Sequence, residues 1–161
     1  MGSSEKIIDW EGVVDSLKKW RSNKEKIVFT NGCFDILHLG HIDYLEKARS
    51  LGNRLIIGLN SDSSVTKLKG AGRPIYEQDA RARILAALEF VDIVIMFDQE
   101  TPYDLINHVK PDVLVKGNDY LAENIVGADI VKSNGGEVLT INLIEGYSTS
   151  TIIEKIKQLN I

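Results

Sequence analysis

Short apolar runs alternate with amphipathic stretches along most of the chain. The runs are continuous rather than alternating, which is typical of strands buried on both faces. In the stretches between them, apolar residues recur every three or four positions, as expected of helices with one buried face. The pattern predicts an α/β fold, a doubly wound, Rossmann-like parallel sheet covered by helices and joined by right-handed crossovers.

The predicted elements follow one another closely. Five strands are predicted at residues 26–30, 54–59, 91–97, 112–116 and 137–141. Helices are predicted at residues 9–23, 39–51, 78–89, 102–109, 124–134 and 149–159. Residues 61–77 are polar and rich in glycine and cations, and are predicted to form a long loop that acts on a ligand.

The length of 161 residues favours one domain over residues 1–161, with the N-terminal helix at about 9–23 and the core at about 26–160. The composition, 43% hydrophobic and 26% charged, is that of an ordinary globular protein. No apolar run approaches the roughly 20 residues that span a bilayer, and no secretory leader is apparent. With its single cysteine, Cys33, the chain is expected to be cytoplasmic and to have no membrane partner.

The formal net charge of −4 argues against nucleic acid as a partner, because nonspecific binding to a polyanion needs a broad cationic face. A small anionic ligand remains compatible, since it needs only a few cations and backbone amides in one cleft.

The segment TNGCFDILHLGH, residues 30–41, carries the clearest chemistry. A strand that ends at Asn31-Gly32 exposes backbone N–H groups, and the helix starting near Leu39 adds the positive end of its dipole. His38 and His41 are three residues apart, so both imidazoles can face one phosphate. Gly40 between them leaves room for a ligand because it lacks a β-carbon. We predict a phosphate site here.

Two further segments, residues 116–120 and 146–151, follow the fourth and fifth predicted strands. The carboxyl ends of parallel strands share one edge of a sheet, where ligands bind if the strand order reverses. Hydroxyls and free N–H groups at Ser148, Thr149 and Ser150 would form a second anion cradle there, although ordinary helix capping explains them equally well.

Other interpretations of the histidines and the cysteine are structural or metal-binding. Each histidine could simply cap a helix, and Cys33 is better explained as a small buried residue than as a nucleophile. A zinc site would need a further ligand beside His38, His41 and Cys33, and the chain has no CxxC or HExxH pattern. No metal ligand is therefore expected from protein side chains.

The segment GCFDILHLGHIDYL, residues 32–45, resembles the cytidylyltransferase-like nucleotidylyltransferases, whose HxGH motif corresponds to residues 38–41. The stretch YSTST, residues 147–151, is similar to the hydroxyl-rich start of the last helix in that family. The resemblance is closest to the adenylyltransferases that make ADP-heptose for lipopolysaccharide, and covers roughly residues 8–158. It rests on the segments NSDSSVTKLKG, GRPIYEQDARARILAALEFVD, FDQETPYDLI and PDVLVKGNDY.

The resemblance implies that AMP passes from ATP to a heptose 1-phosphate, giving ADP-heptose and pyrophosphate, with Mg²⁺ held by the nucleotide phosphates. His38, His41 and Lys69 are the expected catalytic residues. The expected nucleotide-binding residues are Thr30, Asn31, Gly32, Cys33, Phe34, Gly40, Gly58, Asn60, Lys116, Gly117, Asp119, Ser148, Thr149 and Ser150. Asp35, Lys67, Arg73 and Arg81 are expected to bind the acceptor or its phosphates.

The sequence differs from the family at two positions, and one domain of the bifunctional relatives is not found in this segment. Lys67 stands where relatives often have arginine, which keeps the charge but loses bidentate geometry. Asn118 replaces an expected small residue. The sugar kinase domain of the bifunctional relatives does not precede this segment, so the kinase step is expected to belong to another chain.

One alternative is the same reaction with another acceptor, namely glycerol 3-phosphate, ethanolamine phosphate or flavin mononucleotide, and with CTP or ATP as the nucleotide. Another is a non-catalytic regulatory module that only binds a nucleotide. A homo-oligomer, dimer or tetramer, is expected because the N-terminal helix has two tryptophans and several aliphatic residues to bury.

Overall fold

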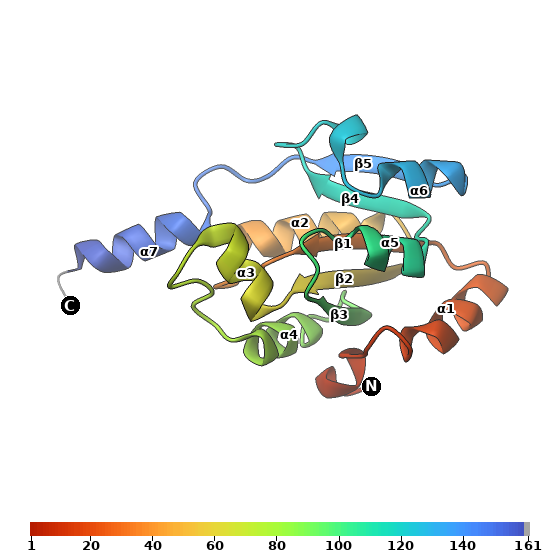
Figure 1. The fold of residues 1–161 in the computed structure, drawn as a ribbon, viewed down its shortest axis with the longest axis horizontal. Helices are drawn as coiled ribbons and strands as arrows, with labels where there is room; N and C mark the ends of the chain where they lie inside the picture. The colour runs from red at the N-terminus through yellow and green to blue at the C-terminus, as the bar shows by residue number, and fades with distance from the viewer. Residues whose placement is uncertain (160–161) are drawn as a thin grey trace.

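The computed structural model describes residues 1–159, and its centre is a sheet of five parallel strands (Figure 1). The order is β3-β2-β1-β4-β5. The strands are β1 (Ile27–Gly32), β2 (Arg54–Asn60), β3 (Ile93–Phe97), β4 (Val113–Gly117) and β5 (Glu137–Ile141). The predicted doubly wound, Rossmann-like sheet is confirmed.

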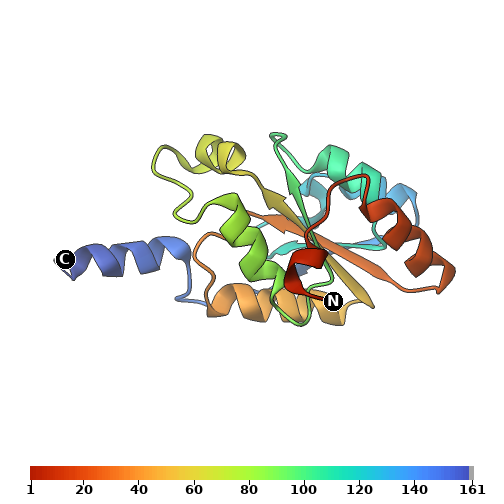
Figure 2. The same cartoon turned by 90° about the horizontal axis from the view of Figure 1, so that it is seen from below.

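Helices cover both faces of the sheet (Figures 1 and 2). One core lies against α1 (Val13–Ser22), α5 (Tyr103–Val109) and α6 (Ala128–Ser133). The other lies against α2 (Leu39–Ser50) and α4 (Gln78–Ala86). Ile27 and Phe29 of β1 enter the first core and Val28 the second, so both faces of the strand are apolar. This is why the strands lack polar alternation in the sequence.

The largest difference from the sequence prediction is α3 (Asp62–Lys69), which occupies half of the predicted loop at 61–77. Ser61 caps this helix by accepting a hydrogen bond from the Ser64 backbone N–H. Only Ser64 and Val65 of the helix are buried, so it lacks the apolar period that reveals a helix in a sequence. Two short 3₁₀ helices, η1 (Ser3–Lys6) and η2 (Ala122–Asn124), were also not predicted.

The last helix, α7 (Thr149–Gln158), extends away from the rest of the molecule in both views (Figures 1 and 2). None of its residues is buried in the part of the chain that the structure describes. Its first turn nevertheless contacts the body, because the Thr149 hydroxyl donates to the Asp35 carbonyl at 2.5 Å. The predicted core ended at residue 160, which lies outside the described residues.

The central strands part at their carboxyl ends. β1 pairs with β2 along its whole length, but with β4 only at Val28 and Phe29. The strand order reverses at this point, because β2 and β3 lie on one side of β1 and β4 and β5 on the other. A crevice beyond the carboxyl ends of β1 and β4 is therefore expected to be the binding site.

The N-terminal segment covers the β3 edge of the sheet. Ile7 forms a parallel bridge with Val94, and the Trp10 indole N–H donates to the Met96 carbonyl at 3.1 Å. Trp20 is buried, and Trp10 packs against the same core. Both tryptophans thus pack on their own domain, so they do not need a second subunit to cover them. The predicted homo-oligomer stays a prediction. No helix within residues 1–159 has the length and apolarity required to cross a membrane.

Candidate active site

A cavity of about 640 Å³ lies at the carboxyl ends of the strands, where β1 and β4 separate. Three segments predicted to converge do so here: residues after β1, after β4 and at the start of α7. The predicted site residues that line it are Asn31, Gly32, Cys33, Phe34, Asp35, His38, Gly40, His41, Asn60, Lys69, Arg73, Lys116, Asp119, Ser148, Thr149 and Ser150.

The loop between β1 and α2 has a strained backbone. Phe34 and Ile36 have φ of 46° and 51°, in the left-handed region that bulky residues rarely adopt. The Phe34 side chain is buried and meets the edge of the His41 ring, with 5.3 Å between ring centroids. Gly32 makes this possible, since a β-carbon there would lie 3.0 Å from the Phe34 ring. Such strain is typical of functional loops held by the surrounding structure.

His38 and His41 stack on each other at the start of α2, with 3.7 Å between ring centroids. Nδ1 of each ring is buried and has no hydrogen-bond partner among residues 1–159, and neither does Oδ1 of the neighbouring Asn31. Buried polar atoms without partners are rare in folded proteins and call for an explanation such as a ligand. These side chains therefore keep hydrogen-bonding capacity at the cavity wall.

Both imidazoles are neutral at neutral pH. Burial lowers the pKa of His38 below its usual value. Burial, followed by the proximity of His38, lowers the pKa of His41 to about 4, and the charge of Asp35 opposes this. A neutral imidazole donates one hydrogen bond and accepts one, so each ring can still donate to an anion.

Two helices begin at the cavity. His38 is the N-cap of α2 and Ser148 the N-cap of α7, where the Ser148 hydroxyl accepts from the Thr151 N–H at 3.0 Å. Gly40 lets the two approach, because a β-carbon there would lie 3.2 Å from Cβ of Tyr147 and 3.0 Å from the His38 ring. The unsatisfied N–H groups and positive dipole ends of both helices thus face one space, which favours an anion.

Three cations surround the same space. Lys69 comes from the end of α3, Arg73 from the loop that follows, and Lys116 from the end of β4. Lys116 donates to the Asn31 carbonyl at 3.2 Å and lies 5.3 Å from the centre of the Tyr120 ring. Burial lowers the pKa of Lys116, and Asp119 partly opposes this.

At the cavity wall, burial raises the pKa of the Cys33 thiol, which disfavours its thiolate.

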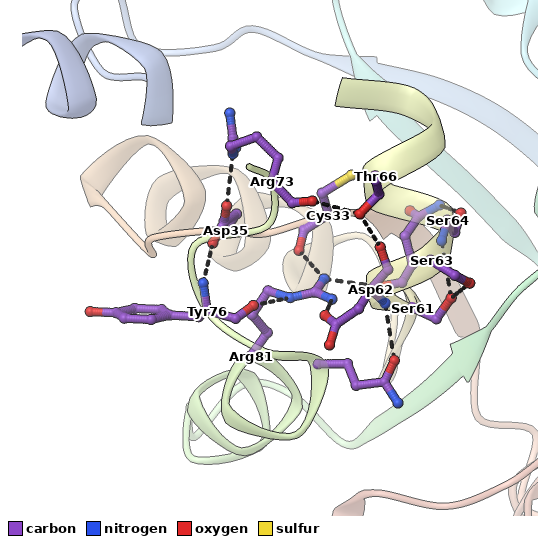
Figure 3. Close-up of polar contacts among 12 residues, drawn as sticks. Cys33, Asp35, Ser61, Asp62, Ser63, Ser64, Thr66, Arg73, Tyr76 and Arg81 are labelled. Atoms are coloured by element: carbon purple, nitrogen blue, oxygen red, sulfur yellow. Dashed lines mark hydrogen bonds and ion pairs between the residues drawn. The ribbon is translucent and has the colours of Figure 1, made fainter. Parts of the chain in front are cut away.

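Asp35, predicted to be a substrate ligand, makes its contacts within the protein. Its carboxylate accepts hydrogen bonds from the backbone N–H groups of Ile75 and Tyr76 and from Nε of Arg73, at 2.7–3.0 Å (Figure 3). Although burial opposes it, these bonds hold the pKa of Asp35 below its usual range. With its side chain 1% exposed, Asp35 holds the loop before α4 in place, and its predicted role as a substrate ligand stays a prediction.

Arg81, predicted to bind phosphates, also makes its contacts within the protein. Its side chain is fully buried, and its guanidinium donates to Tyr76, Cys33, Asn60 and Asp62 (Figure 3). It lies outside the cavity lining, and four of its five guanidinium N–H groups have partners among residues 1–159, so these contacts give no support to its predicted role in binding phosphates, which stays a prediction.

Four other predicted ligands do not line the cavity: Thr30, Gly58, Lys67 and Gly117. The buried Thr30 hydroxyl pairs with the Tyr44 hydroxyl at 2.7 Å. Gly58 is a packing position, because a β-carbon there would lie 2.8 Å from the Phe29 ring. Lys67 is exposed on α3. A β-carbon on Gly117 would lie 2.6 Å from the Asp119 carboxylate, so this glycine acts by admitting Asp119.

Sequence reasoning did not name several residues of the cavity wall as ligands. They are Tyr44, Leu68, Glu100, Thr101, Pro102, Tyr120, Asn124, Ile125, Val126, Leu143, Ile144 and Tyr147. Tyr44 lies in α2 and Leu68 in α3. For the others the position after β3, β4 or β5 was the available signal, because loops at the carboxyl edge share one site.

The cavity suits phosphates better than a bare metal ion. Within residues 1–159, no three His, Cys, Asp or Glu side chains are grouped so as to hold a metal. Its carboxylates are Asp35, which is already saturated, Glu100 and Asp119. The expected Mg²⁺, bound through the phosphates of a nucleotide, stays a prediction.

Comparison with known proteins supports this chemistry. The sequence profile of the family described as cytidylyltransferase-like matches residues 29–155. The bifunctional protein HldE of Pseudomonas paraeruginosa is 54% identical over 157 residues, which are 98% of this chain and 33% of that protein. HldE of Magnetococcus marinus is 49% identical over 95% of this chain and 31% of its own length. The chain thus spans about a third of the curated relatives it matches.

Solved structures agree on the fold. A lipopolysaccharide core biosynthesis protein from Thermoplasma volcanium has a TM-score of 0.59 and 28% identity, and the match covers 77% of this chain and 99% of that one. Pantoate-beta-alanine ligase from Francisella tularensis has a TM-score of 0.57 over 96% of this chain and 78% of its own, at 16% identity, which shows the fold alone. Because the family profile matches most of the chain, the protein belongs to the cytidylyltransferase-like family and is an enzyme of the nucleotidyltransferase type.

Proposed function

We propose that the protein transfers AMP from ATP to a heptose 1-phosphate, giving ADP-heptose and pyrophosphate. The observation that carries the transfer is the stacked pair His38 and His41, whose Nδ1 atoms have no partner among residues 1–159, at a cavity that also receives three cations and two helix starts. The acceptor rests on similarity, since the relatives named HldE and the lipopolysaccharide core biosynthesis protein share this segment.

The reaction needs no protein nucleophile. An oxygen of the sugar phosphate attacks the α-phosphorus of ATP, the bond from that phosphorus to the bridging oxygen breaks, and pyrophosphate leaves with the electron pair. The protein must align two anions that repel each other and stabilise the charge that develops on the transferred phosphoryl group. We assign His41 chiefly to the α-phosphate, with His38 as a second donor.

The cations and helix starts have complementary roles. Lys69 and Arg73 come from one side of the cavity and Lys116 from another, so they can hold the phosphates that arrive and leave. The N–H groups at the start of α7 would bind the nucleotide phosphates. Mg²⁺ bound to those phosphates would neutralise part of their charge.

A screen for pyrophosphate release tests the proposal. ATP, CTP, GTP and UTP are combined with heptose 1-phosphate, glycerol 3-phosphate, ethanolamine phosphate and flavin mononucleotide. We expect turnover with ATP and heptose 1-phosphate. A preference for another pair would keep the reaction and overturn the acceptor. Tight ATP binding without turnover on any acceptor would instead indicate a regulatory module.

The variant His41→Ala tests the site itself. We expect kcat to fall about a hundredfold, because a donor to the transferred phosphoryl group is lost. The thermal midpoint should change little, since Nδ1 of this ring has no partner to lose among residues 1–159. His108→Ala is the matched control, because His108 lies away from the cavity and contacts the Trp10 carbonyl. Full activity in His41→Ala would refute the assignment.

A further inference from the structure

Arg81 is buried beneath the cavity and is almost fully used as a hydrogen-bond donor. Nε donates to the Tyr76 carbonyl at 2.9 Å, Nη1 to the carbonyls of Cys33 and Asn60 at 2.8 Å each, and Nη2 to the Asp62 carboxylate at 2.7 Å. Four of the five guanidinium N–H groups therefore have partners within the protein. A buried cation with these bonds fixes the groups around it, because moving any of them leaves a buried polar atom unpaired.

The partners of Arg81 come from separate segments of the chain, and two of them, Cys33 and Asn60, line the cavity (Figure 3). Cys33 follows β1, Asn60 ends β2, and Asp62 lies in the first turn of α3. Tyr76 belongs to the loop between α3 and α4. One side chain thus joins the ends of two central strands to the helix that carries Lys69.

Polar contacts rather than an apolar face join α3 to the body. Besides the ion pair with Arg81, the Asp62 N–H donates to Gln78 Oε1 at 3.0 Å, the Asn60 amide donates to the Ser64 hydroxyl at 2.9 Å, and the Thr66 hydroxyl donates to the Arg73 carbonyl at 2.7 Å. Only Ser64 and Val65 of the helix are buried, and its last turn, with Lys69, is exposed. The helix has eight residues, so it is about 12 Å long, and a tilt of about 5° at its first turn would displace its far end by about 1 Å. The polar contacts at the first turn therefore control where Lys69 lies.

We propose that Arg81 is a positioning residue that sets the place of Lys69 at the cavity through its ion pair with Asp62. The inference rests on the proposed function, in which Lys69 holds a phosphate during the transfer. Arg81 itself touches no substrate. Its effect on turnover passes through α3, whereas Asp35 holds the neighbouring loop through Arg73, Ile75 and Tyr76.

A double-mutant cycle between Asp62 and Lys69 tests this link. Asp62→Ala removes the ion pair but leaves the bonds of Arg81 to Cys33 and Asn60, and the partly exposed site admits water. We expect kcat to fall by roughly ten- to a hundredfold, as for an ångström-scale misplacement of a phosphate-binding group. In a Lys69→Ala background the same change should cost almost nothing more. Equal losses in both backgrounds would overturn the proposal.

Conservative and distant variants separate positioning from general destabilisation. Asp62→Asn keeps an acceptor for Nη2 and should recover most of kcat. Arg54→Ala is the control, because Arg54 is also an ion-paired arginine but is only partly buried and starts β2 at the other end, paired with Glu25 and Asp92. It should lower the thermal midpoint and leave kcat unchanged. A similar fall of kcat in Arg54→Ala would contradict the inference.

Limited tryptic digestion gives a result that does not depend on turnover. The bonds after Lys67 and Lys69 should be cut several-fold faster in Asp62→Ala than in the wild type, and at the wild-type rate in Arg54→Ala. Unchanged cleavage in Asp62→Ala would overturn the inference even if the enzyme works as proposed. If the wild type turns over no acceptor, the proposed function fails, and the digestion still decides whether the ion pair holds α3.

Discussion

The two imidazoles of the site are chemically unusual because they are close together, partly buried and neutral. A second positive charge 3.7 Å from the first would be strongly unfavourable, and burial already disfavours either charge. Each neutral ring still has one N–H group that can donate to a phosphate. Within residues 1–159, Nδ1 of each ring is buried without a hydrogen-bond partner.

This burial makes stability depend on pH. The pKa of His41 is about 4 in the folded protein and near 6.5 when unfolded, so only the unfolded chain gains a proton between these values. The contribution of the neutral His41 ring to the free energy of unfolding should be fully present above about pH 6.5. The free energy of unfolding should then fall by up to roughly 3 kcal/mol as the pH drops to 4. His38 adds in the same direction.

The measurement is denaturant unfolding of the wild type and of His41→Asn at several pH values from 7 to 4. The difference between the two proteins isolates this histidine from carboxylates such as Asp35, whose pKa is also lowered. The wild type should lose stability more steeply than the variant. Parallel curves would show that His41 is not buried in its neutral form.

At the scale of elements, most of helix α7 is exposed, whereas its first turn lies at the cavity. Its N-cap Ser148 accepts from the Thr151 N–H, while Thr149 donates to the Asp35 carbonyl. Because the helix is not held by a buried apolar face, these polar contacts decide how its N–H groups present themselves to a phosphate.

Ser148→Ala should therefore raise KM for the nucleotide several-fold while the global thermal midpoint changes little. The lost cap costs about 1 kcal/mol, and this loosens mainly the start of α7. Steady-state kinetics with varied ATP would show the change. Ser22→Ala, which removes an exposed hydroxyl bond at the end of α1, should behave as the wild type. An unchanged KM for ATP would show that the start of α7 does not bind the nucleotide.

For the whole molecule, stability and activity are located in different regions. The N-terminal segment protects the β3 edge through Ile7 and Trp10, and the ring of His108 lies 5.6 Å from that of Trp10. The chemistry lies at the carboxyl edge between β1 and β4. Changes in the first region should therefore leave turnover intact.

Trp10→Ala should lower the free energy of unfolding by roughly 1–3 kcal/mol, because a partly buried indole and its bond to Met96 are lost. Denaturant titration measures this, and kcat/KM at 25 °C should equal that of the wild type. Trp10→Phe keeps most of the apolar contact and should recover part of the loss. A lower kcat/KM in either folded variant would show that the N-terminal segment reaches the site.

The sequence alone determined the order of strands and helices and the segment that carries the histidines. Continuous apolar runs such as Ile27–Phe29 reflect burial on both faces, and the strand, Gly32 and the His38 to His41 spacing are local along the chain. Helix α3 was missed because its stability comes from a cap and an ion pair rather than from an apolar stripe.

Only the tertiary structure decided which charged residues face the ligand. Arg73 and Arg81 both looked suited to phosphate, yet Arg73 reaches the cavity while Arg81 is enclosed among carbonyls from two strand ends. Likewise, Asp35 binds backbone N–H groups forty residues away along the chain. Residue type and spacing specify what a side chain can bind, but its partner depends on contacts between distant segments, and these form only when the sheet and its loops pack together.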